Sequence, residues 1–301
     1  MKHLLNSILP YFKLLDNFSS LELISRLTVI FLLIHFGVGQ IYDDYVVLGS
    51  AITILGALSL FIPKIIHNKF YWASFAFLYF VFLFYSWTYS DNHLYLWGYF
   101  IFALSLIKFA PKASQQDLLF ISAKWLIGLC MLFAVIQKLI SPTFLNGDFF
   151  LWTFLTDTRF QFLGYVLDID LMAISNQNDD LIDTMKMNAR PIPLVYDNLP
   201  KLMLLSKVMT WYVMIIESVM AILFLLPHKW GHYGWRHASL IFFGLGVYPL
   251  VPVRGFAAIL IILGLSLTKP NQRLLRFIYL ALLIYIYLFA SFVKGSLLFG
   301  T

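Results

Sequence analysis

The stretch Leu129-Cys130-Met131-Leu132-Phe133-Ala134-Val135-Ile136-Gln137-Lys138-Leu139-Ile140-Ser141-Pro142 places one lysine in an otherwise apolar run. With the apolar residues before it, this run predicts a helix long enough to cross a bilayer core of roughly 30 Å. Pro142 cannot continue a helix, so Lys138 is expected in the last turn. The lysine is either an anchor whose ammonium reaches the lipid headgroups or, when partly desolvated, a general base.

Apolar runs of this kind recur along the whole chain. Hydrophobic residues make up 61% of the sequence and charged residues only 12%. Because lipid offers the backbone no hydrogen-bond partner, runs that cross a membrane must be helical. We therefore expect an all-α fold, a polytopic transmembrane helical bundle with about nine spans. The predicted spans are 20–41, 46–63, 70–90, 93–110, 118–140, 205–226, 237–252, 254–268 and 275–297.

The charges between the predicted spans indicate an orientation. Lysines and arginines dominate every second connection, whereas the alternate connections carry aspartates such as Asp43 and Asp91. By the positive-inside rule, the N-terminus is then inside and the C-terminus outside. Orientation against an anionic inner leaflet explains the net charge of +6 better than a nucleic-acid partner does. We expect an integral membrane protein, in the cytoplasmic (inner) membrane if the chain is bacterial.

Two segments lie outside the predicted spans. Residues 1–17 carry apolar residues at helical spacing, interrupted by Pro10, which predicts an amphipathic helix on the inner surface. Residues 18–301 are expected to form a single transmembrane domain with a long external connection at 141–204. The first part of this connection is apolar enough for one or two short helices, whereas 176–180 and 190–193 are predicted to be irregular.

Glu217 is the least expected residue in the predicted sixth span. A charged side chain near the middle of a span costs about 2.5–3.5 kcal/mol or more. Glu217 must therefore be protonated, paired or facing a polar cavity, and His35 is its nearest candidate partner by depth. A structural hydrogen bond between helices and a catalytic role both fit this position.

Further polar residues are expected on the outer side, where Lys138 ends its span. His93 opens the fourth span: it either sits in the interface behind an Asn92 cap or, as a neutral imidazole, relays a proton. Arg254 follows a proline-broken corner and presents a cation on the same side. On the inner side, Arg26 and Arg236 are interpreted as headgroup anchors.

Several common sites have no signal in the sequence. No P-loop, serine-hydrolase or zinc-protease motif occurs, and the histidines do not group at metal-ligand spacings. Cys130 is the single cysteine, so no intrachain disulfide can form and we expect no metal site.

Three of these stretches together resemble the horizontally transferred transmembrane (HTTM) domain family, which includes the vitamin K-dependent gamma-carboxylase. Residues 133–139, with Gly147 beyond them, look like the family's lysine segment. Residues 92–98 are similar to its Asn-His-x-Tyr-Leu-Tyr-Gly segment, and 21–28 to the start of its first span. Glu217 falls where the carboxylase has an aspartate, and 242–248 is similar to a late helix. The resemblance covers residues 20 to about 295.

The resemblance implies a carboxylase-like chemistry of the lyase or oxidoreductase type. Lys138 would be the base that deprotonates a hydroquinone of the vitamin K or menaquinol type, with His93 in the same catalytic site. The residues expected to contact this cofactor are Asn92, Tyr95, Gln137, Gly147, Glu217 and Arg254. Gln137 replaces a lysine of the carboxylase, which changes the local charge. O2 and CO2 are the implied co-substrates.

The expected partners are membrane lipid, the quinone, and a peptide or protein substrate or a soluble partner domain. The carboxylase carries a large soluble domain after its membrane region. We expect no such domain after the last predicted span here, so the resemblance leaves the protein substrate open. Two other functions stay open. One is a non-catalytic membrane protein that binds quinone, lipid or peptide, with 141–204 as its lid. The other is a small transporter that uses Glu217.

Overall fold

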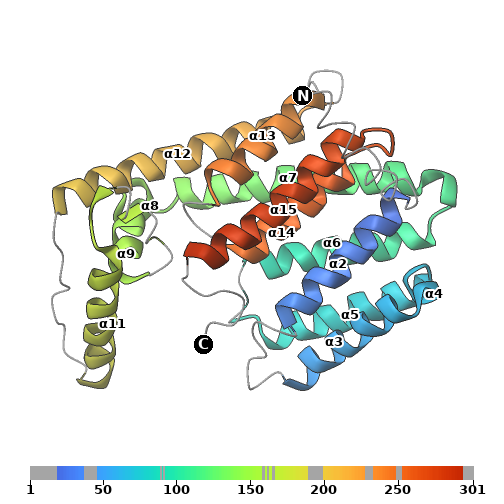
Figure 1. Ribbon diagram of the computed structural model, residues 1–301, viewed down its shortest axis with the longest axis horizontal. Coiled ribbons are helices and arrows are strands. Elements are labelled where there is room, and N and C mark those ends of the chain that lie inside the picture. The colour runs from blue at the N-terminus through green and yellow to red at the C-terminus, as the bar shows by residue number, and fades with distance from the viewer. Residues whose placement is uncertain are drawn as a thin grey trace. The chain divides into compact units, whose positions relative to one another are not determined.

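The structure is a computed structural model that describes residues 19–36, 46–88, 90, 92–157, 160, 163–164, 167–188, 199–227, 233–248 and 253–293. All regular elements among these residues are helices, and no strand occurs in them (Figure 1). The prediction of an all-α fold is therefore confirmed. The helix predicted at 1–17 and the irregular segment predicted at 190–193 lie outside the described residues.

Each predicted span corresponds to one helix of the structure. These helices are α2 (Ser20–Ile34), α3 (Val46–Phe61), α5 (Lys69–Tyr85), α6 (Asn92–Phe109), α7 (Lys112–Leu139), α12 (Leu199–Leu225), α13 (Tyr233–Gly246), α14 (Arg254–Ser266) and α15 (Arg273–Val293). Within the described residues, α7 and α12 are long and apolar enough to cross a membrane. They indicate a membrane protein, while the full set of nine spans and its orientation stay predictions.

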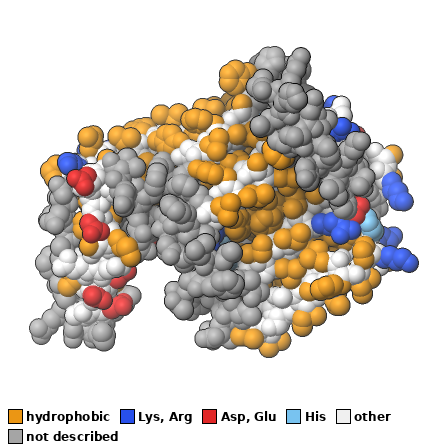
Figure 2. Space-filling view, in the orientation of Figure 1, with side chains coloured by type: hydrophobic (Ala, Val, Ile, Leu, Met, Phe, Trp, Pro, Cys, Tyr) orange, Lys and Arg blue, Asp and Glu red, His pale blue; other side chains and the backbone are white. Residues whose placement is uncertain are grey.

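The exposed surface is also apolar. Large hydrophobic side chains are exposed along several helices; Phe61 is 85% exposed, Phe77 72% and Phe84 76%. Figure 2 shows hydrophobic side chains over much of the visible surface. A water-soluble protein rarely exposes contiguous apolar patches beyond a few hundred Å². Such a surface is typical of a protein that associates with a membrane.

The predicted external connection contains more helix than the sequence suggests. It holds α8 (Pro142–Leu145), α9 (Asp148–Thr156) and α11 (Leu171–Asn188), and α12 begins before the predicted 205. Residues 176–180 lie inside α11, so their prediction as irregular chain is wrong. The physical reason is a pair of side-chain bonds. Asp170 accepts from the Ala173 amide at 2.9 Å, and the buried Asn178 amide donates to the Leu155 carbonyl at 3.0 Å.

Two compact units can be separated by their internal contacts. Unit 1 consists of Met1–Ile127 and Gly255–Leu283, and unit 2 of Gly128–Arg254 and Ile284–Thr301. The prediction of one domain over 18–301 is not tested by this division.

Unit 1 is held together by close helix packing and by buried hydrogen bonds. Gly98 of α6 lies so near α5 that a Cβ there would meet Leu83 at 2.7 Å. The Tyr79 hydroxyl of α5 donates to the Leu94 carbonyl of α6 at 3.1 Å. The short helix α4 (Pro63–Ile66) lies between α3 and α5 in the sequence. The carbonyl of its last residue, Ile66, accepts hydrogen bonds from the Trp72 indole and from the Lys108 ammonium.

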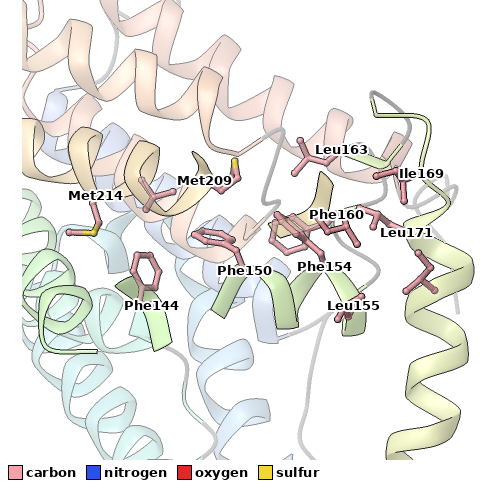
Figure 3. Packing of buried hydrophobic residues seen from close by; sticks show 13 residues of the cluster. Phe144, Phe150, Phe154, Leu155, Phe160, Leu163, Ile169, Leu171, Met209 and Met214 are labelled. Atoms are coloured by element: carbon pink, nitrogen blue, oxygen red, sulfur yellow. The ribbon is translucent and has the colours of Figure 1, made fainter. Parts of the chain in front are cut away.

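Unit 2 has its own hydrophobic cluster, in which α8 and α9 pack against α12 and α11 packs against α9 (Figure 3). We call it the phenylalanine cluster. Its buried members are Phe144, Phe150, Phe154, Leu155, Phe160, Leu163, Ile169, Leu171, Ile174, Leu202, Met209, Val213 and Met214. The burial explains why this connection is folded rather than a free loop.

Candidate functional site

Lys138 and Glu217 form an ion pair inside unit 2. The Lys138 Nζ donates to Glu217 Oε1 at 2.9 Å and to Oε2 at 2.6 Å. The two side chains are only 19% and 8% exposed. Of the three states predicted for Glu217, the structure shows the paired one. The sequence offers His35 as the nearest candidate partner of Glu217 by depth, whereas the partner that the structure shows for the carboxylate is Lys138.

The antiparallel packing of α7 and α12 explains why these two residues meet. Gly128 of α7 lies against Leu225, where a Cβ would come within 2.8 Å of the leucine side chain. Lys138 follows Gly128 by ten residues along α7, and Glu217 precedes Leu225 by eight residues along α12. The absent side chain at Gly128 lets the helices approach, and the register then brings the lysine opposite the glutamate.

Phe144 covers the ammonium of Lys138. Its ring centroid lies 5.4 Å from Nζ, within the range of a cation–π contact. Ser141 caps α8 by accepting from the Phe144 amide at 3.3 Å, and Pro142 occupies the first turn, where its missing N–H is not needed. Phe144 is also part of the phenylalanine cluster. The connection that follows α7 therefore returns over the ion pair and shields it from water.

Gly147 has a backbone role beside this site. Its φ of 89° is left-handed, and it precedes the first residue of α9. A Cβ there would lie 3.1 Å from Ser206 Oγ and 3.3 Å from the Lys207 amide nitrogen. Glycine is thus required both by the turn and by the close approach to α12. Contact between Gly147 and a cofactor stays a prediction.

Tyr248 and Cys130 are neighbours of the ion pair that the sequence did not single out as site residues. Both lie close enough to Glu217 to interact electrostatically with it. Tyr248 is only 3% exposed, and its hydroxyl has no hydrogen-bond partner among the described residues. Cys130 is half-buried on α7. The stretch 242–248 is notable in the sequence only for its similarity to a late helix of the HTTM family, and no pattern in it predicts a role for the tyrosine.

His93, Asn92 and Tyr95 belong to unit 1. His93 is 8% exposed in the first turn of α6, and its ring meets that of His35 edge-on at 5.7 Å. Gly255 lies against the same ring, so closely that a Cβ would overlap it. Asn92 is exposed, and the Tyr95 hydroxyl donates to the Trp87 carbonyl at 3.0 Å. A shared site of His93 with Lys138 stays a prediction, because the two residues lie in different units.

The remaining predicted residues have mixed outcomes. Gln137 is exposed next to Lys138, and Arg254 is half-buried as the first residue of α14; their contact with a cofactor is untested. Arg26 bonds to Glu22 of the same helix at 2.8 Å. Arg236 is not a headgroup anchor. It is 1% exposed and donates to the Leu223 and Leu226 carbonyls at 2.8 and 2.9 Å. Its charge therefore caps the C-terminus of α12.

Comparisons of the chain with protein-family models, with curated proteins and with solved structures give no match. The resemblance to the HTTM family rests on the residues quoted above.

Proposed function

We propose that this chain is a membrane protein whose Lys138–Glu217 pair is an acid–base site for a hydroquinone-type lipid. The observation that carries the proposal is the contact of one ammonium with both oxygens of a carboxylate, in a largely buried position between two apolar helices. Charges in such a place are costly, and functional sites are where they are usually found.

The geometry favours a shared role for the two side chains. The sequence assigns the base to Lys138 alone, yet an ammonium beside a carboxylate is stabilised in its charged form. In the pair, the Glu217 carboxylate accepts the proton of the ligand, and Lys138 then faces the ligand anion that remains. Protons bound here belong to the pair rather than to either residue. Phe144 limits the access of water to the ammonium, which strengthens each of these interactions.

The residues around the pair fit a hydroquinone. Such a lipid supplies weakly acidic hydroxyl groups and, after losing protons, electrons for reaction with oxygen. Phe144 offers an aromatic face, and Tyr248 offers a buried hydroxyl that no other described residue bonds to. Lys138 and Glu217 offer a cation and a proton acceptor side by side. Hydrophobic and aromatic linings with a few convergent polar groups are typical of small-molecule sites.

The wider arrangement is part of the same proposal. The helices that match the nine predicted spans cross the membrane with the N-terminus inside, in the cytoplasmic membrane if the chain is bacterial. Carboxylation with CO2 would require a peptide substrate or a soluble partner domain, as in the HTTM-type carboxylase that the sequence resembles.

The experiment is mass spectrometry of the quinones in proteoliposomes after addition of reduced menadione and oxygen. Wild type is compared with the double variant Lys138→Met/Glu217→Met, which removes both charges together. Lys124→Met, which removes another lysine from α7, is the matched control. The proposal predicts oxidised product, including the epoxide, with wild type and Lys124→Met and background amounts with the double variant. Equal product in all three would refute it.

The same ion pair supports a second candidate. A charge-compensated pair is stable within apolar helices and can hold a polar headgroup without reacting with it. Quinone that co-purifies with wild type and is never oxidised would identify a binding protein.

The transporter is a third candidate. Substrate flux in proteoliposomes that is lost in Glu217→Gln would identify it.

A further inference from the structure

The Tyr248 hydroxyl is one of several buried polar groups that have no hydrogen-bond partner among the described residues. Tyr248 is only 3% exposed, and no described group donates to its hydroxyl or accepts from it. Tyr79 shows the usual arrangement, because its equally buried hydroxyl donates to the Leu94 carbonyl. Buried polar groups in native proteins are bonded with few exceptions, and each exception needs an explanation.

The position of Tyr248 relates it to the ion pair. Gly246, two residues before it, lies in close contact with the Tyr212 hydroxyl of α12. Tyr212 precedes Glu217 by five residues, which corresponds to about 7.5 Å along the helix axis. The end of α13 is thus held against the part of α12 that carries the glutamate. The electrostatic interaction of Tyr248 with Glu217 agrees with this placement.

The other face of Tyr248 is apolar. Its ring packs edge-on against Phe243 of α13, with the centroids 5.6 Å apart. A phenol hydroxyl can both donate and accept one or more hydrogen bonds, and an apolar surrounding makes an unmet bond costly. The hydroxyl is therefore suited to a hydrogen bond with a ligand oxygen.

We infer that the Tyr248 hydroxyl is the second polar contact for the ligand of the Lys138–Glu217 pair, and that it selects a ring carrying an oxygen substituent. This inference rests on the proposed function. A site built around a hydroxyl bond rejects the analogue that lacks the partner atom far more strongly than an apolar pocket rejects a changed shape. Tyr248 thus determines specificity, whereas the ion pair handles the proton.

Two probes of the same ring test the inference by calorimetric binding to the full chain in nanodiscs without oxygen. Reduced menadione carries two hydroxyl groups, and methylnaphthalene carries none. Tyr248→Phe removes only the hydroxyl. We expect it to weaken the binding of reduced menadione about tenfold, the value of one hydrogen bond, and to leave methylnaphthalene unchanged. The thermal unfolding temperature should not fall, because the hydroxyl has no partner to lose.

Tyr79→Phe is the matched control. It removes a buried hydroxyl that has a partner, so it should lower the unfolding temperature and keep the affinity for reduced menadione. Equal affinity of Tyr248→Phe and wild type for reduced menadione would overturn the inference and leave the proposed function standing. A lowered unfolding temperature of Tyr248→Phe would also overturn it, since the hydroxyl would then have a structural role. Failure of wild type to bind reduced menadione would reject the proposed function and this inference together.

Discussion

The ammonium of Lys138 contacts both carboxylate oxygens of Glu217, at 2.6 and 2.9 Å, although the two residues lie 79 positions apart in the sequence. The contact joins the last turn of α7 to the middle of α12. Each residue alone would be an expensive charge in an apolar helix, and together they form a compensated unit.

The first prediction concerns the stability of this unit. Lys138→Met or Glu217→Met should lower the free energy of unfolding by about 3–5 kcal/mol, because each leaves one buried charge without a partner. The double variant should lie much closer to wild type. Denaturant unfolding in detergent micelles, arranged as a double-mutant cycle, measures the coupling. A double variant whose loss of stability equals the sum of the two single losses would contradict the pairing.

A second prediction tests the fold of the external connection. Asn178→Asp replaces a buried amide donor with a carboxylate that faces the Leu155 carbonyl. We expect a loss of stability of about 1–3 kcal/mol and faster limited proteolysis between α9 and α12. Asp179→Asn, the opposite exchange at the exposed neighbouring position, is the control and should change neither. Similar proteolysis of both variants would indicate that α11 is not packed on α9.

A third prediction concerns the close approach of Gly255 to His93. Gly255→Ala adds a Cβ where the imidazole already lies, and we expect a loss of about 1–3 kcal/mol from overpacking. Gly234→Ala meets no atom within 4 Å and should be neutral or slightly stabilising, because alanine favours helix. Thermal unfolding compares the two. His93→Ala in the Gly255→Ala background should restore stability, and its failure to do so would locate the strain elsewhere.

A fourth prediction tests the orientation, and the single cysteine makes the experiment simple. In a Cys130→Ser background, cysteines replace Lys64 or Asp180, which are both exposed. The positive-inside rule predicts that a membrane-impermeant maleimide labels intact cells at position 180 and reaches position 64 only after lysis. The reverse pattern would invert the topology. Labelling of both positions in intact cells would argue against an odd number of spans between them.

The helices were predictable because local apolar runs determine them. The pairing of Lys138 with Glu217 was not, although both residues stood out as charges in apolar segments. Their contact depends on the register of α7 against α12. The close packing of Gly128 against Leu225 sets this register, and these two residues are far apart in the sequence. Depth along a predicted span is a weaker guide, and it led to His35.

Other features were invisible for a similar reason. The buried state of Arg236 follows from the end of α12 lying beside α13, and the sequence shows only an arginine near a helix end. Residues 176–180 look like a loop because they are polar, yet the Asn178 side-chain amide donates a hydrogen bond to the Leu155 carbonyl. The interest of Tyr248 lies in its buried hydroxyl, which has no hydrogen-bond partner among the described residues. No sequence pattern predicts this.

The most direct test of the central claim is the rate of oxygen uptake by proteoliposomes when reduced menadione is added. Wild type, Lys124→Met and the double variant Lys138→Met/Glu217→Met are measured together after circular dichroism has shown equal helix content. If the ion pair is the acid–base site, uptake above the protein-free rate occurs with wild type and Lys124→Met and disappears in the double variant. Uptake that persists unchanged in the folded double variant would contradict the account.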